Sequence, residues 1–205
     1  MSIKIIKKKS NLTNEIIERI SKEYERTLVI PKLKLKEQII VCPIGLIGAG
    51  KTTILKPLSK KLSLLRISTD EIREILKKSG YDYECAKEIA YKLIVKYIKK
   101  GFSIGIDADC ISKESQKYIK ELKKEYNIKV FWIHINPPEK FIINKLENYN
   151  HTWLFNSAKE AISSYKKRKS LHKNLNLNFT YVFNTSKDNL KNQINKAIFI
   201  IKNRL

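Results

Sequence analysis

The sequence predicts an α/β fold, a doubly wound five-stranded parallel sheet flanked by helices, with an N-terminal helical extension. Two observations predict this fold class. From residue 39 onward, short apolar runs alternate with amphipathic stretches of helical period. A glycine-rich loop separates the first of these runs from the helical stretch that follows it, which is where such folds bind phosphate. A chain of 205 residues is also long enough for one sizeable core and short for two.

Five apolar segments are expected to form the strands, namely 39–43, 64–67, 102–106, 129–135 and 179–183. Helices are expected over 51–62, 70–78, 84–99, 113–126, 137–147, 157–169 and 187–201. Gly101 follows one of these helices, at a position where glycine favours helix termination. Because ligands of such sheets bind at the carboxyl ends of the strands, the loops after the strands are the candidate site.

The first 36 residues differ in character from the rest of the chain. Residues 12–27 place Ile16, Ile17, Ile20 and Tyr24 at helical spacing, with Thr13 or Asn11 as the N-cap. The following segment, VIPKLKLKEQ, alternates apolar and basic residues around Pro31 and is typical of an extended connector or an edge strand. We therefore expect residues 1–36 to be a basic helical extension and connector, and residues 37–205 to be the phosphate-binding α/β domain.

The formal net charge of +22 indicates affinity for polyanions, which include RNA, DNA and small acidic substrates. An alternative explanation is an AT-rich genome, because lysine, isoleucine and asparagine are abundant while glycine and alanine are few. The charge alone does not choose between these two explanations.

Several classes of protein and site are disfavoured. No apolar run approaches the roughly 20 residues of a membrane-spanning helix, and the N-terminus lacks the features of a secretory signal, so we expect a cytoplasmic protein without a membrane partner. The three cysteines and three histidines are scattered, which argues against a zinc site or a disulfide framework. The cysteines are expected to be buried.

The strongest motif is the loop from Gly45 to Thr52, which fits the phosphate-binding pattern G-x-x-x-x-G-K-[ST] in full. Backbone N–H groups of such a loop surround phosphate oxygens, the lysine reaches the β- and γ-phosphates, and the hydroxyl binds Mg²⁺. Three of the chain's six glycines lie in this loop, which argues against a glycine-rich turn with an incidental lysine. The sequence therefore predicts ATP and Mg²⁺ as ligands. The predicted contact residues are Gly45, Ile47, Gly48, Ala49, Gly50, Lys51, Thr52 and Thr53.

A second group of polar residues follows the second expected strand. Asp70 is suited to take a proton from an acceptor hydroxyl, and Arg73, one helical turn further, is suited to grip an acceptor phosphate. The structural alternative is that Thr69 or Asp70 caps the helix and that Arg73 pairs with a surface carboxylate.

At these residues the chain resembles the small P-loop kinases of the AAA-domain kinase, polynucleotide kinase and zeta-toxin type. In that group an aspartate follows the glycine loop by about 20 residues, with an arginine three residues later. Here Lys51 and Asp70 are 19 residues apart, and Asp70 and Arg73 keep the three-residue step. The resemblance covers about residues 38–202. It implies that Asp70 activates the acceptor, that Arg73 clamps the substrate, and that adenine lies near residues 184–187.

The metal and lid residues are further expectations. Asp107 ends a short apolar strand, where a Walker B carboxylate holds Mg²⁺ together with Thr52, and Asp109 is a rival. The resemblance implies a lid with arginines, but the corresponding region, 144–156, contains Lys145 and no arginine. Arg168 is the nearest candidate, because arginine is rare here and suits bidentate phosphate contacts; a solvated basic helix end is the alternative. Trp153 is expected to pack, or to stack on a base.

The leading hypothesis is an ATP- and Mg²⁺-dependent kinase. It would transfer the γ-phosphate to a hydroxyl of a polynucleotide, a nucleoside, a sugar or another small acceptor, with Lys51, Asp70, Arg73 and Arg168 as catalytic residues. The alternative is an ATP-binding or ATPase switch protein. That protein would bind RNA or a protein partner through its basic N-terminal arm, without phosphorylating it.

Overall fold

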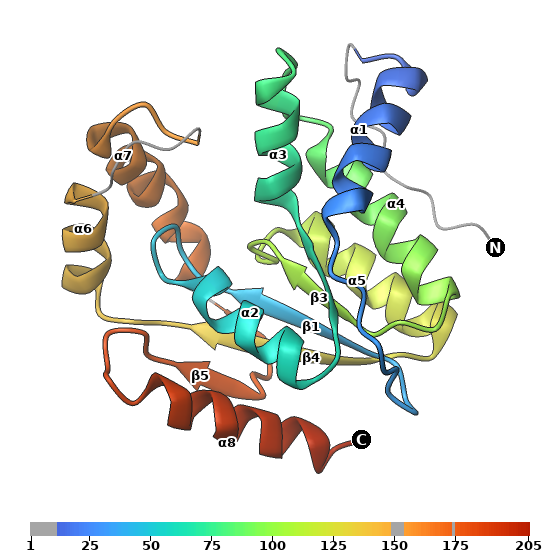
Figure 1. Ribbon diagram of the computed structural model, residues 1–205. Coiled ribbons are helices and arrows are strands. Elements are labelled where there is room, and N and C mark those ends of the chain that lie inside the picture. The colour runs from blue at the N-terminus through green and yellow to red at the C-terminus, as the bar shows by residue number, and fades with distance from the viewer. Residues whose placement is uncertain (1–11, 149–153, 174) are drawn as a thin grey trace.

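The structure is a computed structural model that describes residues 12–148, 154–173 and 175–205. One sheet is formed by β1 (Ile39–Ile44), β2 (Leu65–Ser68), β3 (Ile104–Asp107), β4 (Lys129–Ile135) and β5 (Tyr181–Phe183). Its strand order is β2-β3-β1-β4-β5, and every neighbouring pair is parallel (Figure 1). The predicted five-stranded parallel sheet is confirmed. Its last strand begins two residues later than expected. Phe179, which precedes the strand, stacks on His134 with ring centroids 4.7 Å apart.

The helices follow the predicted order. They are α1 (Asn14–Thr27), α2 (Lys51–Lys61), α3 (Thr69–Lys78), α4 (Ala86–Lys99), α5 (Lys113–Tyr126), α6 (Glu139–Glu147), α7 (Ala158–Lys169) and α8 (Leu190–Lys202), with a 3₁₀ turn at Ser170–His172. Hydroxyl groups cap several of them, since the side chains of Thr13, Ser68, Ser112 and Ser157 accept N-terminal backbone hydrogen bonds. Within the described ranges, no helix combines the length and apolarity needed to cross a membrane.

The helices cover both faces of the sheet, and alternate residues of β1 point to the two faces. Ile40, Cys42 and Ile44 pack in a core with residues of α1, α3, α4 and α5. Ile39 and Val41 pack in the other core, with residues of α2, α6, α7 and α8. Figure 1 shows α8 and α4 on opposite sides of the sheet. This three-layer arrangement leaves the carboxyl ends of the strands as the edge where the loops can form a site.

The N-terminal helix α1 is part of this core. Ile17, Ile20 and Tyr24 are buried against α3 and α4, in the same cluster as Ile40 of the central strand. The hydroxyl of Tyr24 accepts a hydrogen bond of 2.7 Å from the backbone N–H of Ser68, the last residue of β2. The first described helix therefore supports the junction between β2 and α3, which carries Asp70. A division of the chain at residue 36 stays a prediction.

Candidate active site

The glycine loop connects β1 to α2 at the carboxyl edge of the sheet. Gly48 and Gly50 have φ values of 79° and 93°, in the left-handed region that favours glycine. A Cβ on Gly45 would lie 2.9 Å from the carbonyl oxygen of Ile135, so a side chain does not fit there either. Ile47 and Ala49 lie within the loop, and Lys51, Thr52 and Thr53 form the first turn of α2. The eight predicted phosphate contacts thus lie on one continuous segment, which comprises the loop and the first turn of α2.

Lys51 folds back over this loop. Its ammonium donates hydrogen bonds to the carbonyl oxygens of Gly45, at 2.7 Å, and Leu46, at 3.1 Å. Burial lowers the pKa of Lys51 from its ordinary value, while the carboxylates of Asp109, Asp70 and Asp107 act to raise it and the charge of Arg168 acts to lower it. Three carboxylates and one guanidinium are therefore close enough to Lys51 to interact with its ammonium electrostatically.

Thr52 and Asp107 form the candidate metal site. The Thr52 hydroxyl donates to Oδ1 of Asp107 over 3.1 Å, and the Asp107 side chain is only 4% exposed. Burial raises the pKa of Asp107 above its ordinary value, against the opposing effects of Arg66 and Thr52. A hydroxyl and a carboxylate oxygen beside a phosphate loop are the oxygen ligands that Mg²⁺ prefers, so these residues fit the ion.

Asp109, the rival to Asp107, makes a different set of contacts. Its Oδ1 accepts a hydrogen bond of 3.4 Å from the backbone N–H of Gly45, and its Oδ2 lies 3.1 Å from Nε2 of His172. Both partners of the His172–Asp109 pair are largely buried. Asp109 thus joins the start of the glycine loop to the turn that follows α7, and this geometry favours Asp107 as the metal ligand.

The acceptor side begins at the first turn of α3. Ser68, rather than Thr69 or Asp70, caps this helix, because its hydroxyl accepts from the N–H of Glu71 at 3.4 Å. The Asp70 carboxylate is therefore not used as the helix cap. It is half-exposed, and its Oδ1 accepts a hydrogen bond of 2.7 Å from Nη1 of Arg73. Arg73 pairs with Asp70 itself, which places a cation and a candidate base together at the mouth of the site.

Arg73 also lines a cavity of about 250 Å³, and Arg168 of α7 is another of its lining residues. The guanidinium of Arg73 lies 5.9 Å from the centre of the Tyr83 ring, in a cation–π contact. Among the described residues, the Arg168 guanidinium has no ion-pair partner. The structure thus brings Arg168 near Lys51 and Arg73, although its catalytic role stays a prediction.

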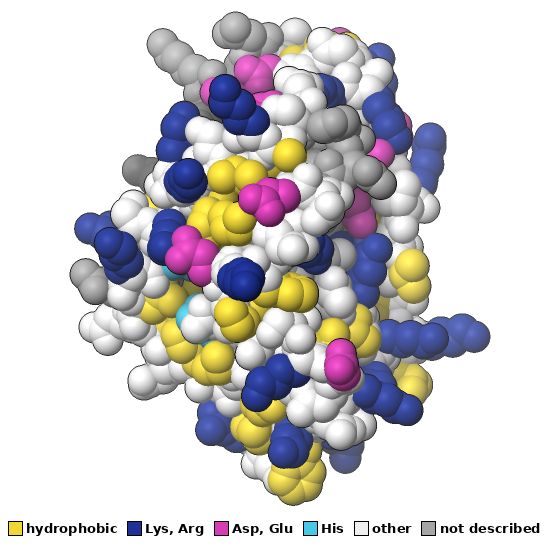
Figure 2. Space-filling model, turned by 90° about the vertical axis from the view of Figure 1, so that its left-hand side faces the viewer, with side chains coloured by type: hydrophobic (Ala, Val, Ile, Leu, Met, Phe, Trp, Pro, Cys, Tyr) yellow, Lys and Arg dark blue, Asp and Glu magenta, His cyan; other side chains and the backbone are white. Residues whose placement is uncertain are grey.

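Figure 2 faces the α6 and α7 side of the molecule, over which Lys and Arg side chains are more frequent than Asp and Glu.

Two other expectations concern the lid and the adenine. Residues 149–153 of the expected lid region, including Trp153, lie outside the described residues. The expected adenine loop, 184–187, contacts the glycine loop, since the Thr185 hydroxyl donates to the carbonyl oxygen of Ala49 over 2.7 Å. This contact fixes the two loops against each other.

Sequence reasoning missed several residues that shape the site. Arg66 of β2 binds Asp107 through Nη1 and Oδ2, 2.5 Å apart, and also pairs with Glu71. The scarcity of arginine, six residues against 36 lysines, is a signal that would have pointed to Arg66 as it pointed to Arg168. His172 and Thr185 gave no local signal, because their partners are 63 and 136 residues away along the chain.

A family model described as an AAA domain matches residues 40–168, a range that contains the glycine loop, Asp70, Asp107 and Arg168. The chain belongs to this AAA domain family. The predicted resemblance to AAA-domain kinases is thereby confirmed, while the individual site residues remain predictions. A comparison of this AAA domain protein with curated proteins found no match in sequence.

Solved structures show which fold the AAA domain adopts here. A chain of the PezAT toxin–antitoxin system of Streptococcus pneumoniae is similar at a TM-score of 0.61 and 16% identity, covering 95% of this chain and 98% of the other. The APS kinase CysC of Mycobacterium tuberculosis, in complex with AMPPNP and APS, has a TM-score of 0.56 at 12% identity, with coverages of 81% and 98%. A gluconokinase of Sinorhizobium meliloti has a TM-score of 0.53 at 11% identity, with coverages of 83% and 94%. The fold is therefore that of the P-loop kinases.

Proposed function

We propose that this protein is an ATP- and Mg²⁺-dependent kinase that transfers the γ-phosphoryl group of ATP to an acceptor hydroxyl. One observation carries the proposal. The ammonium of Lys51 is hydrogen-bonded onto the glycine loop, and the adjacent Thr52 hydroxyl is hydrogen-bonded to the buried carboxylate of Asp107 at the end of β3. A phosphate-binding loop with its lysine, a carboxylate for the metal, a candidate base in Asp70 and an arginine such as Arg168 are the parts that phosphoryl transfer requires.

On the donor side, the backbone N–H groups of the glycine loop and the N-terminus of α2 would surround the phosphates of ATP. Lys51 would exchange its two carbonyl contacts for β- and γ-phosphate oxygens, which are stronger acceptors because they are charged. Thr52 and Asp107 would hold Mg²⁺, which when bound neutralises charge on the β- and γ-phosphates. Each of these residues therefore acts on the charge of the triphosphate.

On the acceptor side, Asp70 would accept the proton of the attacking hydroxyl. The acceptor oxygen then bonds to the γ-phosphorus as the bond from that phosphorus to the bridging oxygen breaks, and ADP leaves with the bonding electron pair. Arg73 and Arg168 would stabilise the negative charge spread over the equatorial oxygens. The proton on Asp70 returns to solvent after the products leave.

The cavity beside Arg73 favours a particular kind of acceptor. Its volume of about 250 Å³ suits a small molecule or one terminal unit of a polymer, and the guanidinium groups of Arg73 and Arg168 reach it. Three carboxylates also line it, but Glu88 pairs with Lys92 and Glu114 lies 3.7 Å from Lys87, which leaves Glu84. Guanidinium groups bind phosphate and carboxylate in a bidentate manner. We therefore propose an acceptor that carries an anionic group near its reactive hydroxyl, such as a nucleotide, a sugar acid or the end of a polynucleotide.

The test is a transfer assay with γ-labelled ATP and Mg²⁺ over matched pairs of acceptors. Each pair would contain a neutral hydroxyl compound and its phosphorylated or carboxylated counterpart. The proposal expects a labelled product, formed at a higher kcat/KM from the anionic member. Tight ATP binding with slow hydrolysis and no labelled product would contradict the kinase and support an ATP-dependent switch instead.

A further inference from the structure

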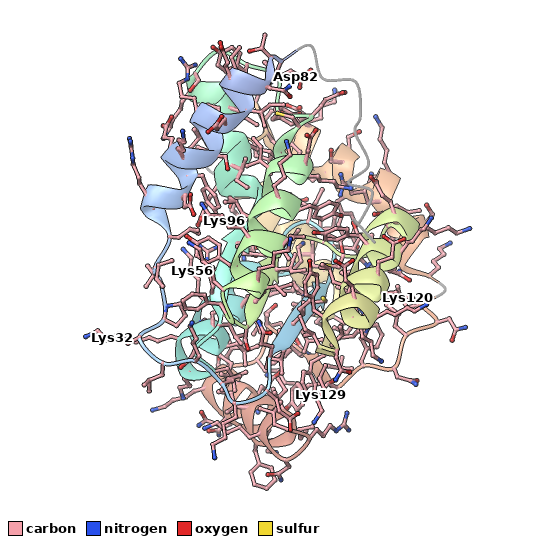
Figure 3. All side chains as sticks on the ribbon, turned by 90° about the vertical axis from the view of Figure 1, so that its right-hand side faces the viewer. Lys32, Lys56, Asp82, Lys96, Lys120 and Lys129 are labelled. Atoms are coloured by element: carbon pink, nitrogen blue, oxygen red, sulfur yellow. The ribbon has the colours of Figure 1, made fainter. Side chains whose placement is uncertain are left out.

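A row of lysines runs along the outer face of α5. Lys113, Lys117, Lys120 and Lys124 recur at steps of four, three and four residues, so they share one face of the helix over about 16 Å. All four are exposed, and they line a shallow groove of about 430 Å³ together with Gln116 and Glu121. Figure 3 shows Lys120 projecting from this face.

The row leads toward a wider hollow at the amino ends of β1 and β4. This hollow measures about 770 Å³ and is lined by Lys36, Lys123, Lys129 and Arg204, with Tyr126 at the end of α5. Lys129 also appears in Figure 3, on the same side of the molecule as Lys120. Lys123 lines the hollow and its neighbour Lys124 lines the groove, so the last turn of α5 contributes to both depressions.

Most of the positive charge in both depressions is not neutralised by the protein. Lys129 pairs with Glu37 at 2.6 Å, and Lys117 lies 4.0 Å from Glu121. In the part of the chain that the structure describes, no ion pair engages the other lysines of the row or the Lys36, Lys123 and Arg204 side chains. We call this set the α5 track, which comprises Lys113, Lys117, Lys120, Lys124, Lys123, Tyr126, Lys36 and Arg204.

We propose that the α5 track binds single-stranded nucleic acid. Grooves that hold single strands combine cations that follow the backbone with an aromatic ring on which a base stacks, and the partly exposed ring of Tyr126 beside Lys123 supplies that ring. A membrane surface fits less well, because the exposed large apolar side chains of the described residues all lie outside the track. The net charge of +22 provides a long-range attraction for such a strand.

The hollow of the track lies at the edge of the sheet opposite the proposed kinase site, whereas Lys113, at the start of α5, is next to Glu114 of the acceptor cavity. The glycine loop follows the carboxyl end of β1, whereas Gln38 and Lys129, which line the hollow, lie at the amino ends of β1 and β4. The six residues of β1 separate these edges by about 20 Å. Binding at the track is therefore expected without ATP and in a Lys51→Ala variant, so it can be tested whether or not the protein is a kinase.

The test measures fluorescence anisotropy of a labelled oligothymidylate of about 20 nucleotides with the full chain, over a range of salt concentrations. A triple variant, Lys117→Gln, Lys120→Gln and Lys124→Gln, is expected to bind at least about tenfold more weakly. Its slope of log affinity against log salt should fall by about two, because each lost phosphate contact removes about 0.7. The matched control, Lys56→Gln, Lys60→Gln and Lys196→Gln, removes the same charge from exposed positions of α2 and α8.

Two outcomes would overturn the proposal. One is equal weakening by the two triple variants, which would indicate diffuse attraction; the other is equally tight binding of polyglutamate or of duplex DNA of the same length. Tyr126 gives an independent measurement, since Tyr126→Phe keeps the ring and should retain affinity, whereas Tyr126→Leu should lose it. If Tyr126→Leu binds like the unmodified protein while both remain folded by circular dichroism, no base stacks on this residue.

Discussion

Arg66 and Asp107 form a largely buried ion pair between neighbouring strands, with Nη1 and Oδ2 2.5 Å apart and side chains only 18% and 4% exposed. The pair lies directly behind the candidate metal site, because the other oxygen of Asp107 accepts the hydrogen bond of Thr52. Arg66 thus compensates the burial of the carboxylate and leaves Oδ1 facing the glycine loop.

The first prediction concerns the stability of this pair. Arg66→Met leaves the Asp107 carboxylate buried without its counter-ion, so we expect the free energy of unfolding to fall by about 3–5 kcal/mol, measured by urea denaturation. The double variant with Asp107→Asn should recover part of that loss, since no charge is then buried alone. Lys78→Met, which breaks the more exposed pair with Glu74, should change stability by less than about 1 kcal/mol. Simple additivity of the two single changes would argue against the coupling.

Lys51→Ala should abolish nucleotide-dependent chemistry. The variant loses the cation that would contact the β- and γ-phosphates, and removal of such a preorganised donor costs about 10²–10³-fold or more in rate. ATP turnover and the affinity for a fluorescent ATP analogue would be measured together. The control is Lys56→Ala, an exposed lysine of the same helix, which should behave like the unmodified protein. Unchanged turnover in Lys51→Ala would show that the loop does not serve ATP.

Asp70→Asn should separate ATP binding from transfer. The amide oxygen keeps an acceptor for Arg73, but it no longer takes a proton from the acceptor hydroxyl, so transfer should fall by about 10²–10⁴-fold with ATP affinity retained. The measurement is single-turnover transfer from labelled ATP beside equilibrium ATP binding. Asp82→Asn, at an exposed position beyond α3, is a matched control. An Asp70→Asn protein with full transfer activity would refute the assigned role.

Arg168→Ala tests whether this arginine acts on the transferring phosphoryl group. Arginines in this role contribute about 10³-fold or more to kcat, so the variant should lose rate while its affinity for ATP changes little. Arg168→Lys should restore only part of the loss, because an ammonium lacks the planar fork of donors. Lys167→Ala removes one positive charge from the neighbouring exposed residue. Equal losses from Arg168→Ala and Lys167→Ala would indicate a general field effect and no specific contact.

The sequence predicted the fold well because periodicity and the glycine loop are local signals. Each predicted strand and helix is found, with boundaries that differ by a few residues, and Ser68 has the capping role that the structural alternative gave to Thr69 or Asp70. Contacts between distant segments were not predictable. The Asp109–His172 pair and the hydrogen bond from Thr185 to Ala49 depend on how whole elements pack, and no spacing along the chain encodes them.

Tyr24→Phe tests how far the N-terminal helix supports the site. The change removes only the hydroxyl that accepts the N–H of Ser68, and it leaves this buried donor without a partner. An unsatisfied buried N–H costs about 1–3 kcal/mol, so the free energy of unfolding in urea should fall by that amount. Tyr83→Phe removes a hydroxyl from an exposed tyrosine and should leave stability unchanged. If Tyr24→Phe is as stable as Tyr83→Phe, then α1 supports the β2–α3 junction through apolar packing alone, because the hydroxyl would contribute nothing measurable.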